Sequence, residues 1–211
     1  MNDLLMPPPI DPLPAAPLWE RWLFEQPLVP ALALVLLSGV CLAVLARRNR
    51  RAAVALAGVL LLAAGGLALS AHLVTTTRER LLSRTAQLVH AVARADASAL
   101  GELLAEDAQL KASGDLGRVL PRIEGRQALI GRIEQDLGGR YALERWAVHD
   151  AQATVDGPNV ARTQVRVAVQ PRAFDRPHAS WWRLHWTRDQ LGRWRCFEIE
   201  PRWIQLVGSA R

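Results

Sequence analysis

Two long apolar runs near the start of the chain show no polar stripe at helical spacing. Residues 28–46 and 52–74 contain no Asp, Glu, Lys or Arg, and His72 lies near the end of the second run. As a helix, each run is long enough to cross an apolar bilayer core of about 30 Å. The pattern therefore predicts two transmembrane helices, joined by an arginine-rich loop at residues 47–51.

The arginines predict the orientation of this hairpin. Arginine is retained on the cytoplasmic side, so the loop should be cytoplasmic and both termini should face outward. Arg78, Arg80 and Arg84 oppose this orientation, but the first helix has one arginine before it and four after it. The tail at residues 1–27 is long, proline-rich and acidic, which does not fit a cleaved signal peptide. We expect an inner (cytoplasmic) membrane protein with an extracytoplasmic C-terminal domain.

After the second run, apolar residues recur at helical spacing. Residues 78–94 predict an amphipathic helix with His90 on its exposed side. Asp96 suits the N-cap of a second, short helix. Gly125 opens a third helix, which ends at a pair of glycines. The first part of the domain at residues 77–211 is therefore expected to be helical.

Beyond the third helix the pattern alternates with a period of two, which is typical of strands. Residues 160–170 alternate cleanly, and residues 180–188 and 193–201 form a final hairpin around a four-residue loop that Gly192 can close. Helices followed by strands predict an α+β fold in which one sheet wraps over the helices. The expected organisation is a tail at 1–27, a membrane hairpin at 28–76 and an α+β domain at 77–211.

Residues 180–203, which contain the final hairpin, hold five of the chain's eight tryptophans, with arginines between them. With a four-residue loop, Trp182 lies opposite Ile199, and opposed residues of an antiparallel pair share a face. Trp182 and Trp186 are then on the inner face, where core packing is expected and a ligand pocket that includes Trp146 is the alternative. The predicted partner interface is the outer face, with Trp181, Trp194, Arg162, Arg166 and Arg183, and an ordinary solvated sheet face is the alternative.

Several motifs of residues 77–203 resemble the nuclear transport factor two-like superfamily, also called SnoaL-like. They are the first helix, the stretch VARADASALGELLAEDAQL, the helix start IEGRQALIGRI and the last strand GRWRCFEIEP. Asp96 matches the Asp before the family's small-residue helix, and Gly125 matches the Gly that opens the third helix. Gly192 and Trp194 match the Gly-x-Trp of the last strand. The resemblance implies a cone of three helices under a strongly curved antiparallel or mixed sheet.

The resemblance implies two kinds of function. Some members are isomerases or dehydratases with an acid–base pair inside the cone, for which His149 is the candidate base here. Other members are non-catalytic and dimerise through the outer sheet face, and some members are anchored in membranes. No two carboxylates fall where acid–base chemistry needs them. We therefore expect a membrane-anchored, non-catalytic interaction module, with a small-molecule isomerase or dehydratase as the alternative.

Charge and composition exclude other classes. The chain has 26 Lys and Arg and 20 Asp and Glu, and its net charge is +6. From Thr77 onward, 21 basic and 16 acidic residues are interleaved, which does not favour nucleic acid as a partner. Cys41 and Cys196 give no disulfide framework, and no spacing of His, Cys or Asp predicts a metal site or a cofactor. The expected partners are a lipid bilayer, a second copy or another membrane protein, and a small apolar ligand.

Overall fold

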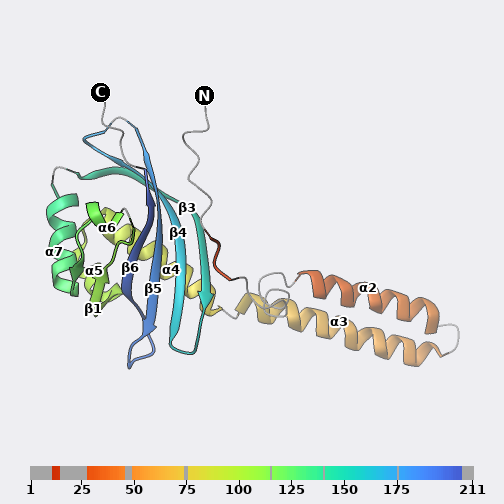
Figure 1. Cartoon of the computed structure of the whole chain (residues 1–211). Helices are drawn as coiled ribbons and strands as arrows, with labels where there is room; N and C mark the ends of the chain where they lie inside the picture. The colour runs from red at the N-terminus through yellow and green to blue at the C-terminus, as the bar shows by residue number, and fades with distance from the viewer. Residues whose placement is uncertain are drawn as a thin grey trace. The chain divides into compact units, whose positions relative to one another are not determined.

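The computed structural model describes residues 11–14, 28–45, 49–73, 76–114, 116–139, 141–174 and 176–205. The rest of the predicted N-terminal tail, and Arg47 and Arg48 of the predicted loop, lie outside these residues. The chain divides into two compact units, one of Ala15–Thr76 and one of Met1–Pro14 with Thr77–Arg211. Figure 1 shows the elements of both units.

The smaller unit is a pair of helices, α2 (Leu28–Leu45) and α3 (Arg50–Leu73), that lie side by side (Figure 1). Small side chains of α3 such as Ala53 are buried, whereas many large apolar side chains of both helices are exposed. The sequence predicted membrane spans at residues 28–46 and 52–74. Among the residues that the structure describes, however, no helix combines the length and the apolar character needed to cross a membrane, so that prediction is not supported.

The helices of the larger unit begin and end close to where the sequence pattern predicts them. Their bounds are α4 Thr77–Ala93, α5 Ala97–Leu103, α6 Leu116–Val119 and α7 Arg126–Leu137. Asp96 caps α5, because its side chain accepts the N–H of Ala99 at 3.0 Å. Gly125, before α7, has a φ of 91°, a conformation that favours glycine. The short helix α6 was not predicted.

The strands of the larger unit form one six-stranded sheet with the order β2-β1-β6-β5-β4-β3. Their bounds are β1 Leu104–Leu110, β2 Ile123–Glu124, β3 Leu143–Val155, β4 Val160–Pro171, β5 His178–Arg188 and β6 Trp194–Ile204. β1 pairs with β6 in parallel, and the other neighbouring strands are antiparallel. The helices cover one face of this mixed sheet (Figure 1), so the predicted α+β class is confirmed.

The core lies between the helices and the inner face of the sheet. It unites apolar side chains of α4, α5 and α7 with alternate residues of β4, β5 and β6. Thr163 of β4 accepts hydrogen bonds there from Trp186 Nε1 at 2.9 Å and from the hydroxyl of Thr85 on α4 at 2.8 Å. All three side chains are fully buried. Because a buried polar group without a partner costs about 1–3 kcal/mol, these two bonds let Trp186 lie in the core and join α4 to the sheet.

The hairpin of β5 and β6 has a loop one residue longer than predicted, and this changes which tryptophans face outward. The loop comprises residues 189–193, so Arg188 pairs with Trp194. The Asp189 side chain accepts the N–H groups of two loop residues, at 3.0 and 2.9 Å, which favours the longer turn. A slip of one residue moves a side chain to the other face. Trp194 is therefore 5% exposed in the core, and its predicted place on the outer face is wrong.

Candidate functional site

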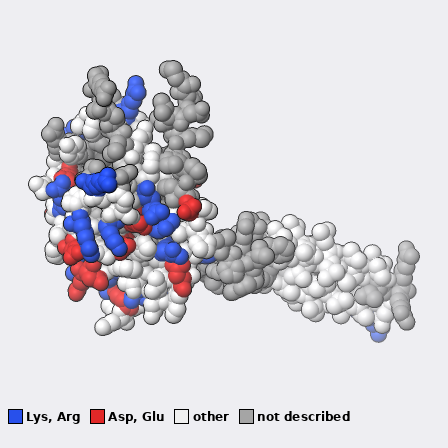
Figure 2. All heavy atoms as spheres, viewed as in Figure 1, with Lys and Arg blue, Asp and Glu red and all other residues white. Residues whose placement is uncertain are grey.

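The outer face of the sheet carries polar and aromatic side chains on its middle strands. Three directly opposed pairs of β4 and β5 residues lie next to one another there. We call these six residues the outer patch: Arg162 with His185, Gln164 with Arg183, and Arg166 with Trp181. The patch contains every predicted interface residue except Trp194. Figure 2 has the same view as Figure 1, in which the strands of the larger unit lie in front of α4. Basic and acidic side chains are interspersed on this side of the unit.

Several charges on and near the outer patch are paired. Arg162 donates two hydrogen bonds of 2.7 Å to Asp156, and these bonds raise the pKa of its guanidinium. Arg166 lies 3.6 Å from the carboxylate of Asp150. Burial raises the pKa of Glu200 on β6, but hydrogen bonds from a serine and an arginine outweigh that effect, so its pKa lies below the ordinary value. The charges of these groups are therefore balanced by partners of opposite charge within the chain.

Arg183, in the middle of the outer patch, is held differently. Its Nη2 donates to Gln164 Oε1 at 3.0 Å and to the main-chain carbonyl of Asp11 at 3.5 Å, and both acceptors are neutral oxygens. Burial lowers the pKa of Arg183, and the nearby Arg202 and Arg162 lower it further. The guanidinium is therefore a half-buried cation whose hydrogen bonds go to uncharged groups.

Several nitrogen atoms of the outer patch are buried without a hydrogen-bond partner in the described part of the chain. They are Nε of Arg166 and of Arg183, Nε1 of Trp181 and Nε2 of His185. Burial also lowers the pKa of His185, against the raising effect of two glutamates that lie 3.9 and 3.8 Å from Nε2. Each buried donor without an acceptor costs about 1–3 kcal/mol. An acceptor oxygen supplied by a ligand or another chain removes that cost.

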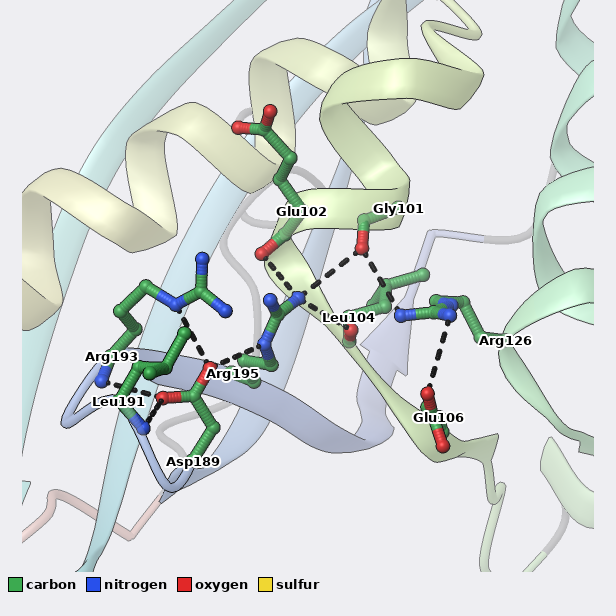
Figure 3. Close-up of polar contacts among 9 residues, drawn as sticks. All are labelled: Gly101, Glu102, Leu104, Glu106, Arg126, Asp189, Leu191, Arg193 and Arg195. Atoms are coloured by element: carbon green, nitrogen blue, oxygen red, sulfur yellow. Dashed lines mark hydrogen bonds and ion pairs between the residues drawn. The ribbon is translucent and has the colours of Figure 1, made fainter.

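Figure 3 shows a second polar cluster, at the loop between β5 and β6. The Asp189 carboxylate accepts hydrogen bonds from Nε of Arg193 and of Arg195, each at 2.9 Å. Arg195 Nη1 also donates to the carbonyls of Gly101 and Glu102, at 3.2 and 2.8 Å. The backbone N–H of Arg193 and the Arg195 side chain hold the pKa of Asp189 far below its ordinary value. The cluster joins the loop to the C-terminal end of α5, where free carbonyls and the helix dipole favour a cation.

The three tryptophans predicted to line a pocket do not share one cavity. Trp186 is 0% exposed in the core, and Trp182 is half-buried with its Nε1 donating to Ser180 Oγ at 2.8 Å. Trp146 lies on β3 with its ring edge-on to His90, the two ring centroids being 5.4 Å apart. Of the three, Trp146 alone lines the open groove of about 530 Å³ that lies along β3 and β4.

The candidate base His149 is exposed on β3, beside an irregularity in pairing between Val148 and Asp150. It is not among the residues that line the groove. Within the described ranges, no group of three or more His, Cys, Asp or Glu is placed to hold a metal ion. The structure thus brings together four of the five predicted interface residues, but not the predicted catalytic and pocket residues.

The thiol of Cys196 is expected to be unreactive in the folded chain. It is fully buried, and burial raises its pKa to about 12. Because the thiolate is the reactive form, almost none is present at pH 8. In a Cys41→Ser variant, a thiol-specific reagent should label no cysteine at that pH until denaturant is added. Labelling of the native variant within minutes contradicts this placement of Cys196.

Among known proteins, only solved structures show a similarity to this chain. No family model matches the chain, and no curated protein matches it. An NTF2-like protein from Cytophaga hutchinsonii is 14% identical, with 60% of this chain and 98% of that one covered and a TM-score of 0.49. An NTF2-like protein of unknown function from Pseudomonas putida is 12% identical, with 59% and 84% covered and a TM-score of 0.49.

Structures of similar shape also include an enzyme. A hexachlorocyclohexane dehydrochlorinase from Novosphingobium barchaimii is 9% identical, with 60% of this chain and 86% of that one covered and a TM-score of 0.48. The neighbours are therefore NTF2-like proteins of unknown function as well as enzymes. At these identities and TM-scores, their activities say nothing about the activity of this chain.

Proposed function

We propose that the chain is a non-catalytic protein-interaction module that is held at a lipid bilayer and binds a protein partner through the outer patch. The observation that carries the proposal is the set of buried N–H donors around Arg183 and Trp181 that lack an acceptor within the described part of the chain. A partner that displaces the groups covering these nitrogens and supplies carbonyl or carboxylate oxygens satisfies them. Tryptophan and arginine are also the residue types enriched in protein interfaces.

Photo-crosslinking tests the interaction. With a photo-reactive amino acid in place of Trp181, the full chain in its native membrane should form a crosslinked species. The same amino acid at Leu191, on the exposed tip of the hairpin loop, is the control and should form none. Arg183→Ala should lower the yield at position 181 about tenfold, as expected for a residue worth about 1.4 kcal/mol of binding.

The mass of the crosslinked species distinguishes a second copy of this chain from another protein. Equal yields at positions 181 and 191, or no effect of Arg183→Ala in a variant whose thermal unfolding is unchanged, contradict the proposal.

The α2–α3 hairpin supports the association with lipid. Leu36 and Leu62 are 70% and 78% exposed, and other large apolar side chains of both helices are exposed as well. Burying one leucine side chain in an apolar medium is worth about 1.5–3 kcal/mol. Acyl chains therefore offer these helices a better environment than water. The proposed location is the inner membrane, with the larger unit on its extracytoplasmic side.

Membrane fractionation tests this placement. The unsubstituted chain should sediment with membranes after an alkaline carbonate wash, and the variant Leu36→Asp, Leu62→Asp should be released. Leu191→Asp, which changes an exposed leucine of the other unit, should sediment as before. A reporter enzyme active only in the periplasm should be active when fused after Arg211. Release of the unsubstituted chain contradicts the association with lipid, and a stable but inactive fusion contradicts the orientation.

A second candidate function is the binding of a small apolar ligand, as in an isomerase or dehydratase. The observation that favours it is the open groove with Trp146 in its wall and His90 against that ring. Native mass spectrometry of the purified chain separates the two functions. A co-purified small molecule that is lost in Trp146→Ala supports the second candidate, and its absence in both proteins supports the interaction module.

A further inference from the structure

A short proline-rich segment of the N-terminal tail lies against the larger unit. Residues 11–14, Asp-Pro-Leu-Pro, belong to the same compact unit as the sheet (Figure 1, red). They form no helix or strand, yet Leu13 is only 7% exposed. A leucine in an isolated extended segment is exposed to water, so its burial shows that the segment is packed onto the domain.

The contact between this segment and the sheet is at the outer patch. The main-chain carbonyl of Asp11 accepts a hydrogen bond from Arg183 at 3.5 Å, at the long limit for such a bond. Gln164, which hydrogen-bonds to Arg183 and faces outward, is 2% exposed. A polar side chain on the outer face is buried to this extent only where other groups cover it. The carbonyl of Asp11 therefore lies against Arg183, in the middle of the outer patch.

The chemistry of the two surfaces is complementary. Pro12 and Pro14 flank Leu13, and proline fixes its own φ and favours an extended, polyproline-like backbone with carbonyls free to accept. Aromatic surfaces recognise such backbones. The peptide is already extended before it binds, so binding costs it little conformational entropy. Trp181 and Arg166 supply the further donors, opposite each other on the same face as Arg183. Among the described residues, their Nε1 and Nε atoms have no partner while residues 11–14 are in place.

We infer that the outer patch is a binding site for an extended proline-rich peptide of a partner protein, with an apolar residue between two prolines, and that residues 11–14 are its tethered occupant. This inference rests on the proposed function and names the kind of partner. Among the residues that the structure describes, the tethered segment makes one long hydrogen bond to the patch and does not reach the Trp181 donor. It occupies the patch because it belongs to the same chain, which makes its binding intramolecular. A partner segment that also reaches Trp181 displaces it.

A peptide titration of the full chain in detergent tests the inference. The probe is a fluorescent peptide with the sequence of residues 7–16, PPPIDPLPAA. Leu13→Asp in the chain should release the tethered segment and leave the patch open. The peptide should bind this variant about tenfold more tightly than the unsubstituted chain, where the tethered copy competes. A peptide that carries the same Leu13→Asp change should not bind.

Second substitutions in the Leu13→Asp chain locate the site. Arg183→Ala, which removes the donor to the Asp11 carbonyl, should weaken peptide binding about tenfold, and Trp181→Ala, which removes the aromatic ring beside it, should also weaken it. Arg172→Ala, at an arginine whose side chain is 76% exposed, is the matched control and should change nothing. No binding to the Leu13→Asp chain, or equal binding when Arg183 is Ala, overturns the inference. If crosslinking at position 181 still depends on Arg183 in that case, the proposed function stands and only the class of partner is wrong.

Discussion

Replacing Trp186 with alanine is expected to lower the free energy of unfolding by about 3–5 kcal/mol, the cost of removing a large side chain from a packed core. Trp186 is fully buried, and its Nε1 donates to Thr163. The substitution leaves a cavity beside α4 and removes one of the two hydrogen bonds that Thr163 accepts. Urea unfolding of the full chain, followed by circular dichroism of the β-sheet signal, measures the effect.

Trp181→Ala is the matched control for this substitution. Trp181 lies on the same strand, but on the outer face and half-buried. Its loss should change the free energy of unfolding by less than about 1 kcal/mol, as is usual for surface positions. A change below 1 kcal/mol for Trp186→Ala, or equal losses for both variants, contradicts the division of the tryptophans between the two faces.

Arg195→Ala is expected to have the second largest effect, a loss of about 1.5–3 kcal/mol in the free energy of unfolding. Its guanidinium donates to Asp189 and to carbonyls at the end of α5, and hydrogen bonds from charged groups are worth about that much. The variant loses the connection between the hairpin loop and α5. Arg193→Ala is the control, because Arg193 binds the same carboxylate with a side chain that is half exposed, and its loss should cost less.

The same cluster should make stability depend on pH. The folded-state pKa of Asp189 is depressed, so its contribution to stability is fully present above its unfolded pKa of about 4 and is lost as the pH falls below that value. The unsubstituted chain should therefore be more stable than Asp189→Asn at pH 7, and the difference should shrink at pH 3. A difference that grows as the pH falls contradicts the assigned contacts.

The elements with a clear hydrophobic period could be predicted from the sequence. α4 buries Leu81 and Leu88 as its spacing predicts, and β4 buries Ala161 and Val165 on one face. The Asp96 cap could also be predicted, because the group that it satisfies lies only a few residues away. Local chemistry and periodicity are sufficient where the interactions are close in sequence.

The hairpin register could not be predicted, because it depends on hydrogen bonds made by one side chain. The sequence shows Asp189 and Gly192 in a turn, but loops of four and five residues both fit them. The Asp189 carboxylate accepts N–H groups within the loop and favours five residues. The one additional loop residue moves Trp194 from the outer face to the core, while Trp181 stays on the outer face.

The contact between residues 11–14 and the outer patch carries no sequence signal of this kind. The segment has no period, and its partner Arg183 is 172 residues away along the chain. The predicted pocket likewise depended on how three tryptophans pack against the helices, and Trp186 is fully buried in the core. Non-local packing of this kind is not encoded in any one segment.

The central claim is that the outer patch binds a partner while the inner tryptophans form a packed core. Fluorine NMR of the Leu13→Asp chain labelled with 5-fluorotryptophan tests it most directly, with the Trp181, Trp186 and Trp194 resonances assigned by single Trp→Phe substitutions. On addition of the peptide of residues 7–16, the Trp181 resonance should move and the Trp186 and Trp194 resonances should stay in place. Movement of Trp186 or Trp194 with Trp181 unchanged contradicts the account.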